Sequence, residues 1–78
     1  MKPKKPTLFF SFSTTVAAME AERICRENSI PGRLVPIPRE ITAGCGLAWM
    51  SVPAQEETIK AFFADQKLDY EGSYILDF

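Results

Sequence analysis

The chain has 78 residues, which is long enough for one domain with a modest hydrophobic core and too short for two. Its composition, 46% hydrophobic and 24% charged, is typical of a soluble globular protein and excludes a largely disordered chain. No apolar run approaches the roughly 18 residues that a membrane-spanning helix needs, so we expect no membrane partner.

Charge is distributed unevenly along the chain. Residues 1–39 carry seven lysines and arginines against three glutamates, a net charge of +4, whereas residues 40–78 carry a net charge of −5. Such an asymmetry can steer an oppositely charged partner or a second copy of the chain. It argues against a nucleic-acid partner, because the acidic half would repel phosphate groups and the basic residues are spread over several predicted elements.

The first residues have the composition of a solvated basic segment ahead of the domain. Three lysines separated by prolines predict a flexible N-terminus over residues 1–6, followed by a single domain over residues 7–78. The apolar residues that come next are interrupted by serines and threonines and then by glutamates, which argues against a signal peptide. Two cysteines without such a signal indicate the reducing cytoplasm.

The first predicted strand covers residues 7–12. Successive side chains of a strand point to opposite faces, so Leu8, Phe10 and Phe12 share one apolar face. The other face is mixed, because Phe9 lies there between a threonine and a serine. This pattern favours a strand with its more apolar face against a core.

A helix follows, with Ser13 as the predicted N-cap. It should end near Asn28, because a serine and then a proline oppose its continuation. Side chains at spacings of three, four and seven or eight residues form its predicted packing face: Val16, Ala17, Ala21, Ile24 and Cys25. Cys25 therefore falls on the buried stripe, and we expect its role to be structural.

Two further strands surround the segment of greatest interest. Residues 32–37 form a strand that contains Pro36, and since proline cannot donate to a strand ladder, this strand belongs at a sheet edge. Residues 47–52 are apolar on both faces, which favours a central position in the sheet.

The remaining predicted elements are a second helix and a final strand. The helix begins near Pro53, and Ile59, Phe62 and Phe63 form its packing stripe. The final strand covers residues 70–76 and is broken in its middle by Gly72.

The order strand, helix, strand, strand, helix, strand predicts a ferredoxin-like βαββαβ fold, an α+β domain with a four-stranded antiparallel sheet and both helices on one face. The expected core holds Phe10, Phe12, Ile24, Met50, Ile59 and Phe62. The opposite face would carry some of Phe9, Trp49 and Tyr74, and we expect it to meet a partner or a second copy in a homodimer. The alternative is one or two ordinary exposed aromatic side chains.

The connection between the second and third strands contains the candidate site. Cys45 stands between Gly44 and Gly46, which remove side chains that would crowd the sulfur and let backbone N–H groups point at it. Arg39 could stabilise a thiolate as a fixed positive charge, and Thr42 could hydrogen-bond to the loop backbone. The alternative is a small buried residue in a glycine turn, since free cysteine is commonly buried.

The run from Pro38 to Ala48, Pro-Arg-Glu-Ile-Thr-Ala-Gly-Cys-Gly-Leu-Ala, resembles the family of small selenium/sulfur carrier-like proteins, first catalogued as a bacterial domain of unknown function. The likeness covers about residues 8–74, and its specific part is Pro-Arg-Glu-Ile, a short polar run and Cys-Gly-Leu-Ala. It implies that Cys45 holds a sulfur or selenium atom as a persulfide or perselenide. Gly44 departs from the polar residue, such as serine, that is expected there, so if a hydroxyl at that position assists the thiol, this chain must use Thr42 or the backbone instead.

Two functions of different classes follow from these observations. In the first, Cys45 takes sulfur or selenium from a donor protein and passes it to an acceptor by thiol exchange. In the second, the domain is a non-catalytic small-ligand-binding or assembly module and Cys45 is incidental. A carrier is favoured over a stand-alone enzyme, because the chain has no histidine to serve as the base of a cysteine nucleophile. We expect neither a metal nor another cofactor, since the chain also lacks a Cys-x-x-Cys pair.

Overall fold

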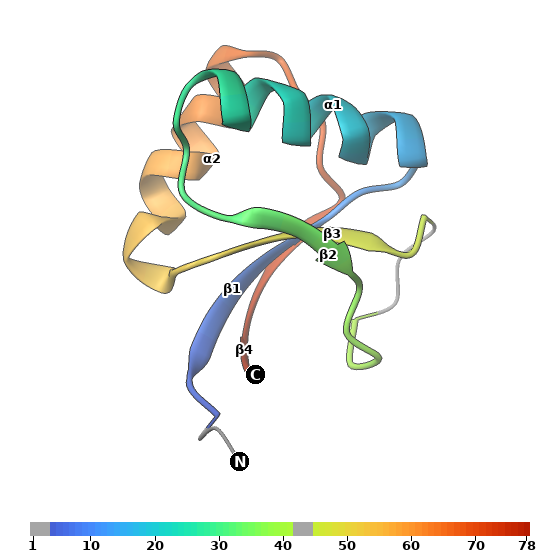
Figure 1. Cartoon of the computed structure of the whole chain (residues 1–78), viewed down its shortest axis with the longest axis vertical. Coiled ribbons are helices and arrows are strands. Elements are labelled where there is room, and N and C mark those ends of the chain that lie inside the picture. Colours follow the sequence, from blue (N-terminus) through green and yellow to red (C-terminus); the bar gives the residue numbers. More distant parts are fainter. Residues whose placement is uncertain (1–3, 42–44) are drawn as a thin grey trace.

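A computed structural model describes residues 4–41 and 45–78, and within them it forms an α+β domain with one antiparallel sheet and two helices. The elements in chain order are β1 (Pro6–Ser11), α1 (Thr15–Glu27), β2 (Arg33–Pro36), β3 (Leu47–Ser51), the 3-10 helix η1 (Pro53–Gln55), α2 (Glu56–Asp65) and β4 (Gly72–Asp77). The strands lie in the order β2-β3-β1-β4. Both helices cover the same face of the sheet (Figure 1), which we call the helix face; the other is the far face. The predicted α+β class is confirmed.

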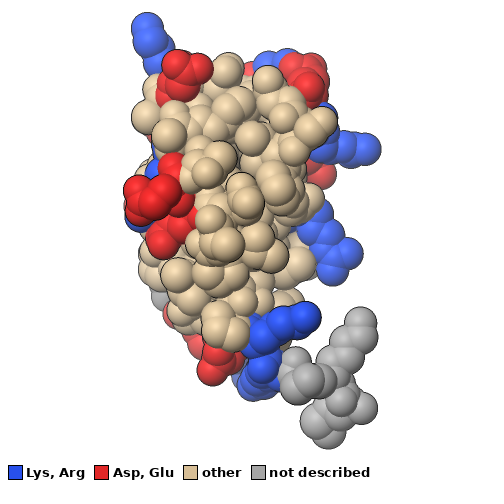
Figure 2. Space-filling view, turned by 90° about the vertical axis from the view of Figure 1, so that its left-hand side faces the viewer, with Lys and Arg blue, Asp and Glu red and all other residues tan. Residues whose placement is uncertain are grey.

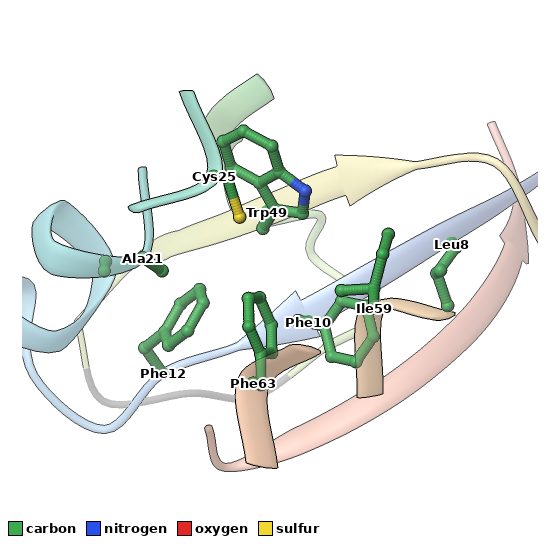
Figure 3. Packing of buried hydrophobic residues seen from close by; sticks show 9 residues of the cluster. Leu8, Phe10, Phe12, Ala21, Cys25, Trp49, Ile59 and Phe63 are labelled. Carbon is green, nitrogen blue, oxygen red and sulfur yellow. The ribbon is translucent and has the colours of Figure 1, made fainter. Parts of the chain in front are cut away.

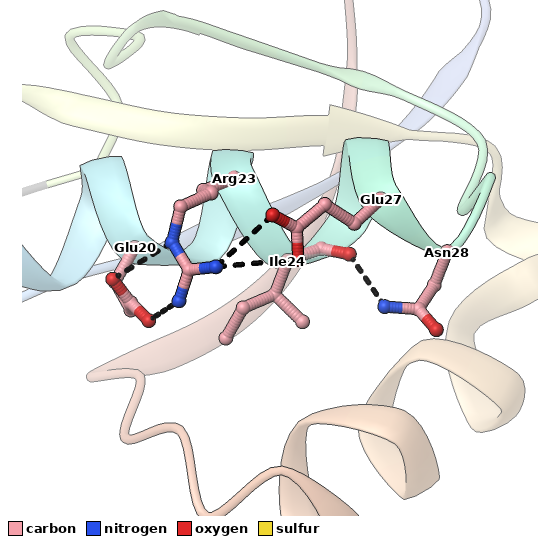
Figure 4. A network of polar contacts seen from close by, with 5 residues as sticks. All are labelled: Glu20, Arg23, Ile24, Glu27 and Asn28. Carbon is pink, nitrogen blue, oxygen red and sulfur yellow. Dashed lines mark hydrogen bonds and ion pairs between the residues drawn. The ribbon is translucent and has the colours of Figure 1, made fainter.

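Helix α1 begins one residue later than the sequence suggested. Thr14, not Ser13, is the N-cap: its backbone is extended, and its hydroxyl accepts a hydrogen bond from the N–H of Ala17 at 3.1 Å. At the other end, the side-chain amide of Asn28 donates to the carbonyl of Ile24 at 2.9 Å (Figure 4). Both ends thus satisfy backbone groups that a helix leaves without partners.

The solvent side of α1 carries a small ion-pair network centred on Arg23. Its guanidinium bridges Glu20 and Glu27, at 3.1 Å from the nearer oxygen of Glu27 (Figure 4). These contacts raise the pKa of Arg23, chiefly through its hydrogen bonds to the two carboxylates. Because all three side chains are exposed, solvent screens these pairs and they contribute little to the stability of the helix.

The core on the helix face is built from alternate residues of β1 and β3 and from one side of each helix (Figure 3). Its buried members are Leu8, Phe10, Phe12, Ala18, Ala21, Cys25, Trp49, Ile59 and Phe63. Aromatic rings pack edge to face, as where Phe10 meets Phe63 with centroids 5.1 Å apart. The predicted core position of Cys25 is confirmed. Val16 was expected on the packing side of α1 but is 78% exposed, because Ala18 and Ala21 face the sheet instead.

The two largest residues of β3 lie on the opposite faces of the sheet from those predicted. Trp49 pairs with Phe10 across the sheet and therefore shares its face, so it lies in the helix-face core rather than on the far face. Met50 pairs with Phe9 and lies half-buried on the far face rather than in the core. The error arose because both faces of β3 are apolar, so only the pairing register distinguishes them.

The far face carries a second, smaller apolar cluster. Phe9, Ile41 and Ala48 are buried in it, and half-buried side chains surround them: Val35, Ile37, Met50, Tyr74 and Leu76. The ring of Phe78 packs edge-on against Phe9 with centroids 5.2 Å apart. The most apolar part of the far face is therefore covered by the chain itself.

The C-terminal strand begins at Gly72 rather than being interrupted there. Tyr70, predicted as part of this strand, precedes it and packs its ring edge-on against Phe10 at 5.0 Å between centroids. Beyond the strand, Lys5 and Phe78 exchange backbone hydrogen bonds, so the two ends of the described chain lie side by side. Figure 2 views the side that carries α2, where charged groups lie mainly along the borders and the centre is uncharged.

Candidate functional site

The connection between β2 and β3 starts with a tight turn on the far face. The N–H of Ile41 donates to the carbonyl of Pro38 at 3.0 Å, which places Arg39 and Glu40 at the exposed tip. Ile41 itself is 4% exposed and packs with Phe9. The Pro-Arg-Glu-Ile run therefore has a structural role: it forms the turn and places the side chain of Ile41 against the far face of the sheet.

Cys45 lies at the other end of the same connection, two residues before β3 begins. Its side chain is half-buried against the helix-face core, and its thiol donates a weak hydrogen bond to the carbonyl of Leu47 at 3.6 Å. The chain is thus on the far face at Ile41 and on the helix face at Cys45. The side chain is neither fully exposed, as a free surface thiol would be, nor enclosed in the core.

The register of the sheet places Cys45 at the end where α1 begins. Ser11, the last residue of β1, pairs with Ala48 of β3. Cys45 comes three residues before Ala48, and the N-cap Thr14 comes three residues after Ser11, so both continue beyond the same end of the sheet (Figure 1). The positive end of the α1 dipole, which favours anions, lies at this end.

Gly46 shapes the backbone beside the thiol. Its φ of +75° lies in the left-handed region that favours glycine. Apart from the chain neighbours of Gly46, no atom of residues 4–41 and 45–78 lies within 4 Å of where a Cβ would stand, so the positive φ is what favours glycine here. The carbonyl of Gly46 accepts a hydrogen bond from the N–H of Ile37 at 3.0 Å, which closes the connection at its base.

Of the other predicted site residues, the structure describes Gly46, which adjoins Cys45 in the chain, and Arg39. Arg39 is exposed at the turn tip and lines a groove with Lys4, Asp77 and Phe78. No hydrogen bond or ion pair joins Arg39 to Cys45 in the described part of the chain. The predicted roles of Thr42 and Gly44 fall on residues outside those described.

That groove was not anticipated from the sequence. Lys4, Asp77 and Phe78 carry no local motif, and the pairing of the first strand with the last, continued by the hydrogen bonds between Lys5 and Phe78, brings them together. The signal that could have indicated it is the antiparallel pairing of the first and last strands, which follows from the order of the elements.

The second cysteine is excluded from surface chemistry by its position. Cys25 is fully buried, and burial raises the pKa of its thiol to about 11. It packs in the same core cluster as Trp49 (Figure 3). Both cysteines are free thiols in the structure.

Residues 4–41 and 45–78 hold neither a metal-binding cluster nor a membrane-spanning helix. No group of three or more cysteine, aspartate or glutamate side chains in this range is arranged to hold a metal ion. Neither helix in the same range has the length and apolar content needed to cross a membrane.

Comparison with known families adds the decisive observation. The family model described as "Putative Se/S carrier protein-like" matches residues 7–75, from the start of the sheet into its last strand and through the Cys45 segment. The chain belongs to this family. No curated protein and no solved structure matches the chain.

Membership of the Se/S carrier protein-like family confirms the resemblance drawn from the Pro-Arg-Glu-Ile and Cys-Gly-Leu-Ala runs. In this member of the family the first run forms a far-face turn, and the second places a thiol at the edge of the helix-face core. The matched region contains both cysteines of the chain, of which only Cys45 has access to the surface.

Proposed function

We propose that this protein carries a sulfur or selenium atom on Cys45, as a persulfide or perselenide, and delivers it to an acceptor. The observation that carries the proposal is that the two cysteines of this Se/S carrier protein-like chain differ in their access to solvent. Cys25 is enclosed in the core, whereas Cys45 is half-buried at the end of β3. A cargo atom needs one accessible thiol and neither a metal nor a second cysteine.

The transfer is a thiol exchange that balances without an external oxidant. The Cys45 thiolate attacks the terminal sulfur of a donor persulfide, an S–S bond forms on Cys45, and the donor leaves as a thiolate. An acceptor thiolate then attacks the terminal sulfur, and Cys45 leaves as a thiolate in turn. A perselenide follows the same course with selenium as the terminal atom.

The surroundings of Cys45 support this role in two ways. The N-terminus of α1, the positive end of the helix dipole, lies at the same end of the sheet as Cys45, which favours the anion that forms during exchange. Half-burial against apolar side chains shields a loaded atom from part of the solvent while leaving a side open for attack. Roles for Arg39, Thr42, Gly44 and Gly46 as anion stabiliser or loop contacts stay predictions.

We also propose the ferredoxin-like designation for the fold. The element order, the antiparallel pairing and the location of both helices on one face support it. The partners we propose are a donor and an acceptor protein in a reducing cytoplasm. A homodimer through the far face stays a prediction, and Ile41 and Phe78 already cover part of that surface.

The carrier role is tested by intact-mass spectrometry of the Cys25→Ala protein after incubation with a small persulfide and removal of the excess. We expect a mass gain of one sulfur atom that is released by a thiol acceptor. Cys45→Ser is the matched variant, and it should gain nothing. A Cys25→Ala protein that stays unmodified, or sulfur that no thiol can remove, would exclude the carrier role.

A further inference from the structure

A groove of about 420 Å³ lies apart from the thiol, between the turn of the β2–β3 connection and the paired ends of the described chain. Pro38, Arg39 and Glu40 line it from the turn, and Lys4, Asp77 and Phe78 line it from the chain ends. Its volume falls within the range of small-molecule sites. Cys45 does not line this groove, so the inference does not depend on the carrier chemistry.

The groove is lined by charged side chains of both signs. Lys4 and Arg39 supply cations, and Glu40 and Asp77 supply carboxylates. Among the residues that the structure describes, no ion pair within 4.0 Å engages any of these four side chains. Their hydrogen-bonding capacity is therefore free for a ligand that presents both a carboxylate and an ammonium group.

An apolar wall completes the groove. The ring of Phe78 packs edge-on against Phe9, which fixes its orientation, yet 55% of the residue is exposed. Pro38, buried at the start of the turn, is a second apolar lining residue. An aliphatic side chain in the groove would remove the face of Phe78 from water, which is favourable.

We propose that this groove binds a small zwitterion, a free α-amino acid with an unbranched aliphatic side chain. Arg39 and Lys4 receive its carboxylate, Glu40 and Asp77 receive its ammonium group, and Phe78 contacts its side chain. The arrangement selects against ligands with a single charge, because each of them leaves one pair of groove charges without a partner.

The test is a titration of uniformly ¹⁵N-labelled protein with L-norleucine, followed by amide chemical shifts. Norleucine contains no sulfur, so its binding is independent of Cys45, and the experiment is repeated on Cys45→Ser. Norleucinamide keeps only the positive charge, and N-acetylnorleucine keeps only the negative one. We expect norleucine to shift amides at the turn and at the chain ends, and to bind about 10-fold more tightly than either analogue.

Variants locate the site. Arg39→Gln and Asp77→Asn should each weaken norleucine binding about 10-fold. The controls Arg26→Gln and Asp65→Asn remove exposed charges of the same kinds from the two helices and should bind like the wild type. Preserved amide spectra of the free variants would establish that each still folds.

Three results would overturn the proposal. Norleucine could leave the groove amides unmoved at millimolar concentration. N-acetylnorleucine or norleucinamide could bind as tightly as norleucine, which would make the groove a site for one charge only. The groove variants could bind as tightly as the two helix controls. Because Cys45→Ser is expected to bind norleucine normally, none of these results bears on the carrier role.

Discussion

Ile41 and Cys45, four residues apart, pack on opposite faces of the sheet. Ile41 is buried with Phe9 on the far face, and Cys45 contacts the core beneath the helices. The connection that carries the thiol is therefore attached at both of its ends: by Ile41 below the sheet, and by Cys45 and the hydrogen bond from Ile37 to Gly46 at the sheet end. The position of the Cys45 thiol therefore depends on contacts with residues that are distant in the sequence as well as on its neighbours in the loop.

Removal of the far-face attachment should destabilise the domain. Ile41→Ala deletes a side chain that is 4% exposed, and we expect a loss of about 2 to 4 kcal/mol in the free energy of unfolding, measured by urea denaturation. Ile75→Ala is the control, because that isoleucine is 48% exposed and should cost about 0.5 kcal/mol. Equal losses in the two variants would contradict the role of Ile41.

Two glycines with positive φ should respond differently to alanine. The Cβ of Gly46→Ala meets none of the described residues beyond its chain neighbours, so we expect backbone strain of about 1 kcal/mol. Gly32, at φ +129°, lies against the carbonyl of Met50 and the indole of Trp49, so a Cβ there also forces these groups to move. We expect Gly32→Ala to cost about 3 kcal/mol or more in the same denaturation experiment. A Gly46→Ala protein less stable than Gly32→Ala would refute this assignment.

The two thiols should differ strongly in their reaction with iodoacetamide. In the native protein at neutral pH we expect Cys45 to be alkylated at least about 100-fold faster than Cys25, because Cys25 becomes accessible only when the core opens. Peptide mapping of a time course measures both rates. In denaturant the two should react at similar rates, and rapid labelling of Cys25 in the native protein would disprove its burial.

Burial of Cys25 should also make stability depend on alkaline pH. Its thiol pKa rises from an ordinary value of 9.0 to about 11 on folding, so the folded state holds the proton more tightly. The resulting stabilisation is complete below pH 9 and is lost as the pH rises through 11, a change of about 2 kcal/mol by pH 11. Relative to Cys25→Ala, the wild type should lose this amount between pH 8 and pH 11.

That comparison isolates a single group. Tyrosines and lysines also titrate in this range, but they are common to both proteins and their effects cancel. Urea denaturation at several pH values gives the free-energy difference directly. A difference that stays constant from pH 8 to pH 11 would mean that the Cys25 thiol titrates normally in the folded protein.

Local patterns in the sequence predicted the elements and the cysteines well. Alternation put Phe10 and Phe12 on the helix face, and helical spacing put Cys25 in the core, because each signal depends on neighbouring residues alone. The patterns failed where two solutions were locally equivalent. Ser13 and Thr14 are both good N-caps, and both faces of β3 are apolar, so Trp49 and Met50 could be assigned only from the register with β1.

The candidate site was predictable in part for the same reason. Glycines beside Cys45 mark a reactive or turn position from sequence alone, and Gly46 does adopt a positive φ. The burial of Ile41 against Phe9 was not visible, because the contact joins residues more than thirty positions apart. The place of Arg39 at the exposed tip of a turn likewise follows from the hydrogen bond between Ile41 and Pro38 and not from its spacing to Cys45 along the chain.

Trp49 gives this protein an optical reporter of its own. It is the only tryptophan in the sequence and is 1% exposed, and its indole N–H has no hydrogen-bond partner among the residues that the structure describes. An indole in so apolar a setting should fluoresce at short wavelength, and the emission should move to the red as the core opens. Because Trp49 belongs to the core cluster against which Cys45 packs, an emission spectrum unchanged by loading would mean that the cargo atom sits outside the core.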